Sequence, residues 1–361
     1  AARHGKPDDR IHFGVMAVVW SGVLAGQVRT MEKSLGILTT LRHRIETNGS
    51  RRATAEVWAG TACIELLAMR WNAVPAGVNV AIRNYALDEK PLRFEVLHTR
   101  WMRMWASWHL GQWDSLRSDA EDMVEDATRQ NDAYQQLLAT SGYGGNAFLM
   151  LDQVEDSVRY GRENQRVVTS GTGVEFADFF RWIHLVQVNL YRGRFRQAAL
   201  DVLRMRDAID RSLIRRVDLI QTIADYLVAL VSLHVSQNGD DGAVDRQIGS
   251  RHIPRQAIRQ LRSREGVFPN LLAELLDGVR RRTEGKTELA LKSFGLAREL
   301  ASGAGLLPYE WAAQDAISHL EGRPCRLLRH KMTAAGILHP GAMERLYIVA
   351  PRDNPEQRDS D

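Results

Sequence analysis

Short glycine-rich motifs in the chain resemble parts of nucleotide-binding loops, but they lack the surroundings that such loops need. Residues 285–287 (GKT) match the end of a phosphate-binding loop, whereas Arg280 stands where that loop requires a glycine. Residues 141–146 (SGYGGN) and 171–173 (GTG) lack the G-x-G-x-x-G spacing. None of the three follows a predicted β-strand. We therefore interpret residues 285–287 as a turn, and residues 141–146 as a close helix contact or a break in a helix.

The residues that could bind a metal or act as nucleophiles also form incomplete sets. Glu95 and His98 form an E-x-x-H pair, but helical di-iron sites need two such pairs and further carboxylates. Cys63 and Cys325 are too few for a disulfide framework or a structural zinc site, and they fit a reducing compartment. The G-x-S-x-G, H-R-D and D-F-G motifs are missing. We therefore predict a cytoplasmic chain without a catalytic residue, metal or cofactor.

A row of tryptophans is the first candidate for a partner-binding surface. Trp101, Trp105 and Trp108 fall at positions i, i+4 and i+7, which is one face of one helix. Aromatic rows at this spacing usually fill the space between helices, so core packing is the first interpretation. A partner-binding patch is the alternative, because exposed tryptophans make good anchors.

A row of arginines is the second candidate. Arg251, Arg255 and Arg259 follow one another at four-residue intervals, Arg262 comes next, and residues 246–264 contain no acidic side chain. A solvated helix face is one interpretation. A docking surface for an acidic or phosphorylated protein segment is the other, because guanidinium groups match carboxylate and phosphate oxygens. Nucleic acid is not expected as a partner, since the net charge is only +4 and no reading motif is present.

The elements that must carry these residues repeat along the chain. Helix-forming residues abound, only 10 prolines occur, and alternating strand patterns are missing. Helix-ending turns recur at intervals of 44, 41, 41, 41, 46 and 46 residues. The turn positions are Gly26, Arg70, Gly111, Asp152, Gly193, Gly239 and Gly285. This period predicts an all-α solenoid of about seven to eight stacked helical hairpins, similar to tetratricopeptide repeats but longer than their roughly 34 residues.

The repeat pattern also sets the expected domain limits. We predict one solenoid domain over residues 11–350, preceded by the end of another repeat or a linker in residues 1–10. Residues 351–361 are polar and are expected to be disordered. The chain lacks an initiator Met, so we expect a part of a longer protein. The apolar stretch 13–26 is shorter than the roughly 20 residues of a membrane-spanning helix, and we expect a buried first helix there.

The C-terminal part resembles a known protein family. Residues 306–313 (LLPYEWAA), 319–322 (HLEG) and 332–343 (MTAAGILHPGAM) are similar to the closing segment of the tetratricopeptide-type arm of large bacterial serine/threonine protein kinases. Residues 185–199 (LVQVNLYRGRFRQAA) resemble the repeats of those arms. In that family a kinase domain and an ATPase domain of the AAA or STAND type precede the arm. The resemblance carries no catalytic residue onto this chain.

These observations predict a non-catalytic arm of a multidomain signalling protein. Its partners would be protein or peptide segments and the upstream domains of its own chain, bound on the concave surface of the superhelix. The resemblance implies that the parent binds ATP and phosphorylates Ser or Thr. Two alternatives stay open: the sensor arm of a STAND-type transcription regulator, or a freestanding adaptor. Near the C-terminus, Met343, Leu346 and Ile348 are expected to cap the last apolar face.

Overall fold

The computed structural model describes residues 7–25, 28–88, 93–159, 176–238, 252–323 and 325–350. Every regular element within these ranges is a helix, so the predicted all-α class is confirmed. In chain order the helices are α1 (Pro7–Ala25), α2 (Val28–Asn48), α3 (Arg51–Leu67), η1 (Trp71–Ala73), α4 (Val74–Ala86), α5 (Arg93–Leu110), α6 (Trp113–Gln130), α7 (Ala133–Thr140), α8 (Asn146–Met150), α10 (Phe176–Tyr191), α11 (Phe195–Asp210), η2 (Leu213–Arg216), α12 (Asp218–Asn238), α14 (His252–Arg262), α15 (Val267–Thr283), α16 (Thr287–Ala304), α17 (Leu307–Leu320), α18 (Leu327–Ala334) and α19 (Pro340–Glu344).

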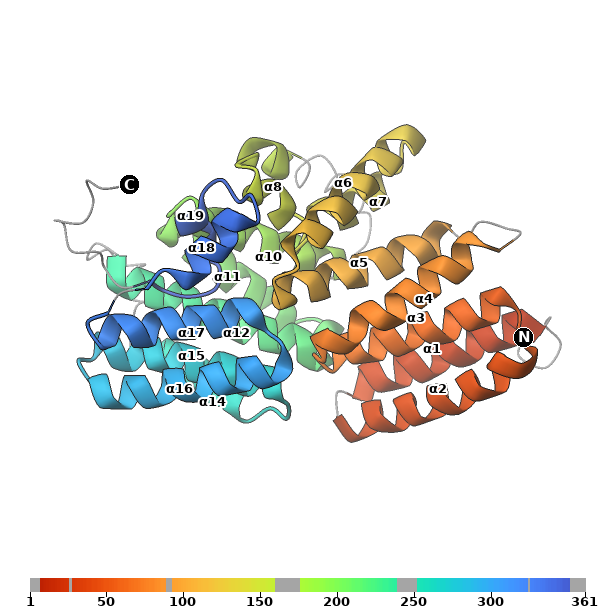
Figure 1. The fold of residues 1–361 in the computed structure, drawn as a ribbon, viewed down its shortest axis with the longest axis horizontal. Coiled ribbons are helices and arrows are strands. Elements are labelled where there is room, and N and C mark those ends of the chain that lie inside the picture. Colours follow the sequence, from red (N-terminus) through yellow and green to blue (C-terminus); the bar gives the residue numbers. More distant parts are fainter. Residues whose placement is uncertain are drawn as a thin grey trace.

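Helices that follow one another in the sequence pack against one another in space. Among these neighbours, α3 packs with α4, α10 with α11, α15 with α16, and α16 with α17 (Figure 1). Five of the seven predicted turns fall at or next to a helix end within the described residues. Positive φ angles, which end a helix, occur at Met69, Gly111, Asp152, Gly193 and Gly285. The predicted turns at Gly26 and Gly239 lie outside the described residues.

The end of the chain departs from this neighbour-to-neighbour pattern. After α17 the chain turns back across the middle of the molecule (Figure 1), where α19 packs against α10 and the α18–α19 connection contacts the end of α8. The backbone N–H of Leu338 donates to the carbonyl of Met150 at 3.0 Å. The Arg345 guanidinium donates to the carbonyl of Tyr191 at 2.7 Å. Residues more than 150 positions apart are therefore held together, which the repeat period does not predict.

The residues expected to cap the last apolar face belong to this returning segment, which comprises residues 327–350. Met343, Leu346 and Ile348 are all buried. They continue one core cluster that extends from Val15 to Val349. The segment is part of the centre of the core rather than a cover at its end.

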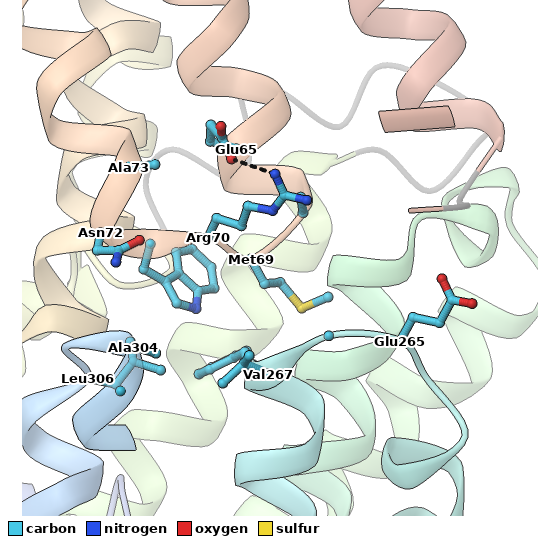
Figure 2. A pocket seen from close by; sticks show the side chains of 14 residues that line it. Glu65, Met69, Arg70, Asn72, Ala73, Glu265, Val267, Ala304 and Leu306 are labelled. Carbon is cyan, nitrogen blue, oxygen red and sulfur yellow. Dashed lines mark ion pairs between the residues drawn. The ribbon is translucent and has the colours of Figure 1, made fainter. Parts of the chain in front are cut away.

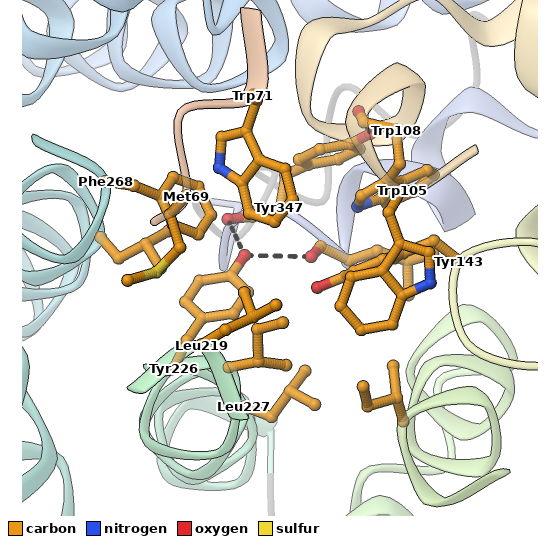
Figure 3. Close-up of a cluster of buried hydrophobic side chains, with 14 of the residues drawn as sticks. Met69, Trp71, Trp105, Trp108, Tyr143, Leu219, Tyr226, Leu227, Phe268 and Tyr347 are labelled. Carbon is orange, nitrogen blue, oxygen red and sulfur yellow. Dashed lines mark hydrogen bonds between the residues drawn. The ribbon is translucent and has the colours of Figure 1, made fainter. Parts of the chain in front are cut away.

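Aromatic side chains from distant elements meet in this centre (Figure 3). The ring of Tyr347 stacks on Trp108 of α5, with centroids 4.6 Å apart and planes inclined by 16°. Tyr309 of α17 meets Tyr347 edge to face at 5.4 Å. Phe268 of α15 meets Trp71 of η1 at 5.2 Å. Aromatic pairs of this geometry add to the stabilisation from burial alone. The cluster therefore joins the N-terminal helices to the C-terminal ones.

The polar atoms of the returning segment are satisfied within this apolar centre. The Tyr226 hydroxyl contacts the carbonyls of Leu346 and Tyr347, at 3.1 and 2.9 Å (Figure 3). The Tyr347 hydroxyl accepts from the Trp113 indole N–H at 3.2 Å and donates to the carbonyl of Trp108 at 3.2 Å. Buried peptide groups are costly without partners, so these bonds allow an irregular segment to cross the core.

The longest apolar helix is also a core element. By length and composition alone, α12 could cross a membrane, but 83% of its apolar window is buried inside the molecule. The N-terminal apolar stretch forms part of α1, whose Val15 and Val19 are buried as expected for a first core helix. Burial by the other helices accounts for the apolar character of α12.

We predict that Tyr347 holds the returning segment in place. Tyr347→Phe removes two buried hydrogen bonds and should lower the free energy of unfolding by about 1–3 kcal/mol. Tyr347→Ala also removes the ring and should cost about 3–5 kcal/mol. Urea denaturation followed by circular dichroism measures both. Leu338→Ala, at an exposed side chain of the same segment, is the control. If Tyr347→Ala costs no more than this control, the segment does not stabilise the fold.

Candidate functional site

A pocket of about 440 Å³ lies where η1 faces the start of α15 and the end of α16 (Figure 2). Its lining combines apolar side chains with a few polar ones at the rim. The lining residues include Met69, Arg70, Trp71, Val267, Phe268 and Leu306. The pocket therefore lies between elements almost 200 residues apart in sequence. The volume of this pocket falls within the range of small-molecule sites.

The local backbone at the end of α3 creates one wall of the pocket. Met69 adopts φ +57°, which ends the helix and turns the chain sharply. Two residues later, Trp71 enters the core with 1% of its surface exposed. Its ring lies 4.1 Å from the ring of His109. The Trp71 indole nitrogen is buried and has no hydrogen-bond partner. The indole nitrogens of Trp101 and Trp105 also lack partners, but of these three tryptophans only Trp71 lines the pocket.

Charged groups at the rim are largely paired with one another. The Arg70 guanidinium lies 3.2 Å from the Glu32 carboxylate and 3.8 Å from that of Glu65. Desolvation raises the pKa of Glu65, and the charge of Arg70 opposes this rise. Glu265 is exposed on the opposite side (Figure 2). Arg70 is thus balanced by carboxylates, and the rim offers no free positive charge.

The predicted arginine surface is instead largely an ion-pair network, in which partly exposed arginines bind carboxylates of the neighbouring helix. Arg255 pairs with Glu284 at 2.8 Å, and Arg262 pairs with Asp277 at 2.7 Å and with Glu274 at 2.8 Å. These carboxylates come from α15 and its C-terminal end, which the sequence argument did not pair with α14. Docking of an acidic partner on Arg255 and Arg262 is therefore not favoured, since their charges are already matched.

The remaining members of the arginine row have different positions. Arg259 is exposed and lies beside a shallow depression lined by Gln256, Gln260 and Ser263. Its side chain donates to the carbonyl of Arg255 at 3.4 Å. Arg251 lies outside the described residues. Among the described members of the row, Arg259 is the one that forms no ion pair with a described carboxylate, whereas Arg255 and Arg262 reach solvent as members of ion pairs.

The network continues through α12 and α15. Arg264 contacts Asp225 at 2.6 Å, and Arg206 of α11 contacts the other oxygen of the same carboxylate at 2.6 Å. Asp277 is buried and also meets Arg280 at 2.6 Å. Burial raises the pKa of Asp277, but hydrogen bonds from its arginine partners lower it more, so the net shift is downward. The arginines therefore connect neighbouring helices.

The tryptophan row is part of the core rather than an exposed patch. Trp105 and Trp108 are buried, and Trp101 is half-buried against the same cluster. Trp101 and Trp105 both pack on Phe180 of α10, at 4.9 and 5.2 Å. These positions agree with the core-packing interpretation. A partner could not reach Trp105 or Trp108 without displacing the helices that cover them.

The glycine-rich run 141–146 has a structural cause. It separates α7 from α8, so the predicted break in a helix is observed. A Cβ atom on Gly145 would lie 2.2 Å from Nδ1 of His184, which shows a close approach of α10. The His184 Nε2 lies 2.7 Å from the Ser157 hydroxyl, a pair that the sequence did not indicate. Burial lowers the pKa of His184 to about 4. Both side chains are inaccessible to solvent, so the pair cannot receive a substrate.

The other motifs have local structural roles. Residues 285–287 form the turn between α15 and α16, and Lys286 pairs with Glu284 at 2.8 Å. His98 contacts the carbonyl of Phe94 at 2.9 Å and the hydroxyl of Tyr134 at 3.1 Å. Across the described ranges, no three His, Cys, Asp or Glu side chains gather in a way that could hold a metal ion.

Comparisons with known proteins add no identification. No family model matches the chain, and no curated protein or solved structure matches it.

We predict that the ion-pair network makes stability depend on pH in the acid range. Hydrogen bonds from Lys286, Arg255 and Arg280 outweigh desolvation and lower the pKa of Glu284 from 4.5 to about 2. Because the folded protein holds the charged form more tightly, this contribution is complete above pH 4.5 and is lost as the pH falls toward 2. Glu284→Gln should therefore reduce the slope of stability against pH in that interval.

Urea denaturation at several pH values between 2 and 5 measures this slope. Glu299→Gln, at an exposed carboxylate of α16, is the matched control and should keep the wild-type slope. Equal slopes for Glu284→Gln and the wild type would show that the network contributes nothing through Glu284.

Proposed function

We propose that this chain is a solenoid of helical hairpins that serves as the non-catalytic interaction and regulatory arm of a bacterial signalling protein. The proposed parent is a serine/threonine protein kinase with an ATPase domain. The packing of helices in sequential pairs supports the solenoid, since each pair covers the apolar face of the next. The sequence resemblance supports the kinase parent. The proposed location is the cytoplasm.

An exposed apolar stripe on α1 is the observation that carries the proposed interaction. Phe13, Met16 and Trp20 follow at i, i+3 and i+7 and are 51%, 37% and 46% exposed. The opposite face of α1 packs through Val15 and Val19. Terminal repeats of a solenoid normally present a polar outer face for solubility. A row of large apolar side chains on this outer face is instead typical of a surface that another protein segment covers.

The placement of this stripe changes the expected mode of binding. A concave surface was the predicted contact site, but the returning C-terminal segment fills the centre of the molecule through Leu346, Tyr347 and Ile348. We therefore infer that partners, including upstream domains of the same chain, dock on the outer face of α1. Arg259 is the remaining described position of the arginine row where an acidic or phosphorylated segment could bind.

A second function is supported by a separate observation. The pocket between η1, α15 and α16 could hold a small effector, as expected for the sensor arm of a STAND-type transcription regulator. In both cases the chain itself binds and regulates, and catalysis belongs to other domains.

The adjoining coding sequence tests the proposed parent. Kinase catalytic motifs followed by a phosphate-binding loop in the same reading frame would support the kinase arm. A DNA-binding helix-turn-helix domain in that frame would support the transcription regulator and overturn the kinase parent.

In a kinase parent, we predict that the double variant Phe13→Glu, Trp20→Glu changes the rate of autophosphorylation several-fold, because charged side chains would prevent apolar docking on α1. Radiolabelled phosphate incorporation measures the rate, and circular dichroism checks that the helices are retained. Leu289→Glu, at an exposed leucine of α16, is the control and should leave the rate unchanged. Equal rates for all three proteins would contradict docking on α1.

A further inference from the structure

The pocket between η1, α15 and α16 contains a hydrogen-bond donor without an acceptor. The Trp71 indole nitrogen is buried without a partner, and Trp71 lines the pocket together with Val267, Ala304 and Leu306. Its ring is fixed by His109 and Phe268, at 4.1 and 5.2 Å. The ring therefore cannot turn to bring its N–H to water without disturbing the core.

A second set of donors lies at the same pocket. Helix α15 begins at Val267, and its N-cap is Gly266, which supplies no side-chain hydrogen bond. The first N–H groups of a helix have no partner within the helix, and those of Val267 and Phe268 belong to residues that line the pocket. The start of a helix also carries a partial positive charge. Two independent features thus favour a hydrogen-bond acceptor in this space.

The charges around the pocket determine which acceptor fits. Arg70 is balanced by Glu32 and Glu65, and Glu265 adds a further negative charge at the rim. A carboxylate or phosphate would meet these carboxylates without a free cation to pair with. A carbonyl oxygen accepts the same hydrogen bonds without that repulsion. The apolar side chains of Met69 and the other wall residues favour an apolar body.

We propose that this pocket binds a small, uncharged, mainly apolar molecule whose carbonyl oxygen accepts a hydrogen bond from the Trp71 indole N–H. The volume of about 440 Å³ suits a ligand of one or two fused rings. The proposal does not depend on the partner surface of α1. Because Trp71 follows α3 while Val267 and Leu306 belong to the C-terminal helices, a bound ligand bridges the two halves of the molecule. Ligand binding therefore stabilises the folded chain.

Three fluorescent probes of similar size test the ligand class. Prodan is a neutral naphthalene ketone, phenylnaphthylamine is neutral without a carbonyl, and anilinonaphthalene sulfonate is an anion. We expect saturable binding of prodan with a blue-shifted emission and a raised melting temperature. The other two probes should bind more weakly. The proposal would be overturned if prodan showed no saturable binding, or if either of the other probes bound more tightly than prodan.

Two variants locate the binding. Trp71→Phe keeps an aromatic ring and removes the N–H, so prodan should bind about 3- to 10-fold more weakly, which is the effect of one neutral hydrogen bond. Gly303→Leu places a side chain at the pocket lining, where a Cβ meets no atom within 4 Å, and should abolish binding. Gly295→Leu on the same helix has equally open space outside the pocket lining and is the matched control.

The Trp20→Glu variant separates this site from the α1 stripe and should bind prodan as the wild type does. Loss of prodan binding in Trp20→Glu, with binding retained in Gly303→Leu, would place the dye on α1 and overturn the pocket site. Circular dichroism of each variant confirms that the compared proteins are folded.

Discussion

The interaction on which the rest of the structure depends is the burial of the chain's own C-terminal segment in the centre of the helices. Tyr347 stacks on Trp108, and the Tyr226 hydroxyl binds the carbonyls of residues 346 and 347. Further bonds run from Arg282 to the carbonyl of Val349 and from Gln237 to that of Ala350. Each satisfies a peptide group that burial would otherwise leave without water, which is why non-helical backbone is stable there. Helices more than 200 residues apart therefore share one core.

Many charged residues also form ion pairs with other residues of the same chain, between neighbouring helices. Arginines of α11, α14 and α15 converge on Asp225 and Asp277, which are both buried. A buried carboxylate is stable only with several hydrogen-bond partners, so these positions require arginine forks from neighbouring helices. The net charge of +4 thus says little about the surface, because many positive charges are neutralised between helices.

With the centre filled and the arginines largely paired, two features of the described residues are proposed for recognition besides the exposed Arg259. One is the apolar stripe of Phe13, Met16 and Trp20 on α1, which suits a protein partner. The other is the pocket beside Trp71, which suits a small molecule. They lie on different elements, so the proposed regulatory arm could combine a protein contact with an effector site. Neither feature involves side chains that perform covalent chemistry.

The sequence by itself determined the helical class and five of the seven predicted turn positions, because helix periodicity and positive-φ residues are local properties. Gly111, Gly193 and Gly285 end helices where the period places them. It also predicted the break at residues 141–146, although the contact with His184 was invisible. The tertiary structure alone decided what the tryptophan and arginine rows do. Spacing gives the face of a helix but not its neighbour, so the rings on Trp105 and the carboxylates beside Arg255 and Arg262 appear only when distant helices pack. The pocket at Trp71 arises in the same way, from elements that only the fold brings together.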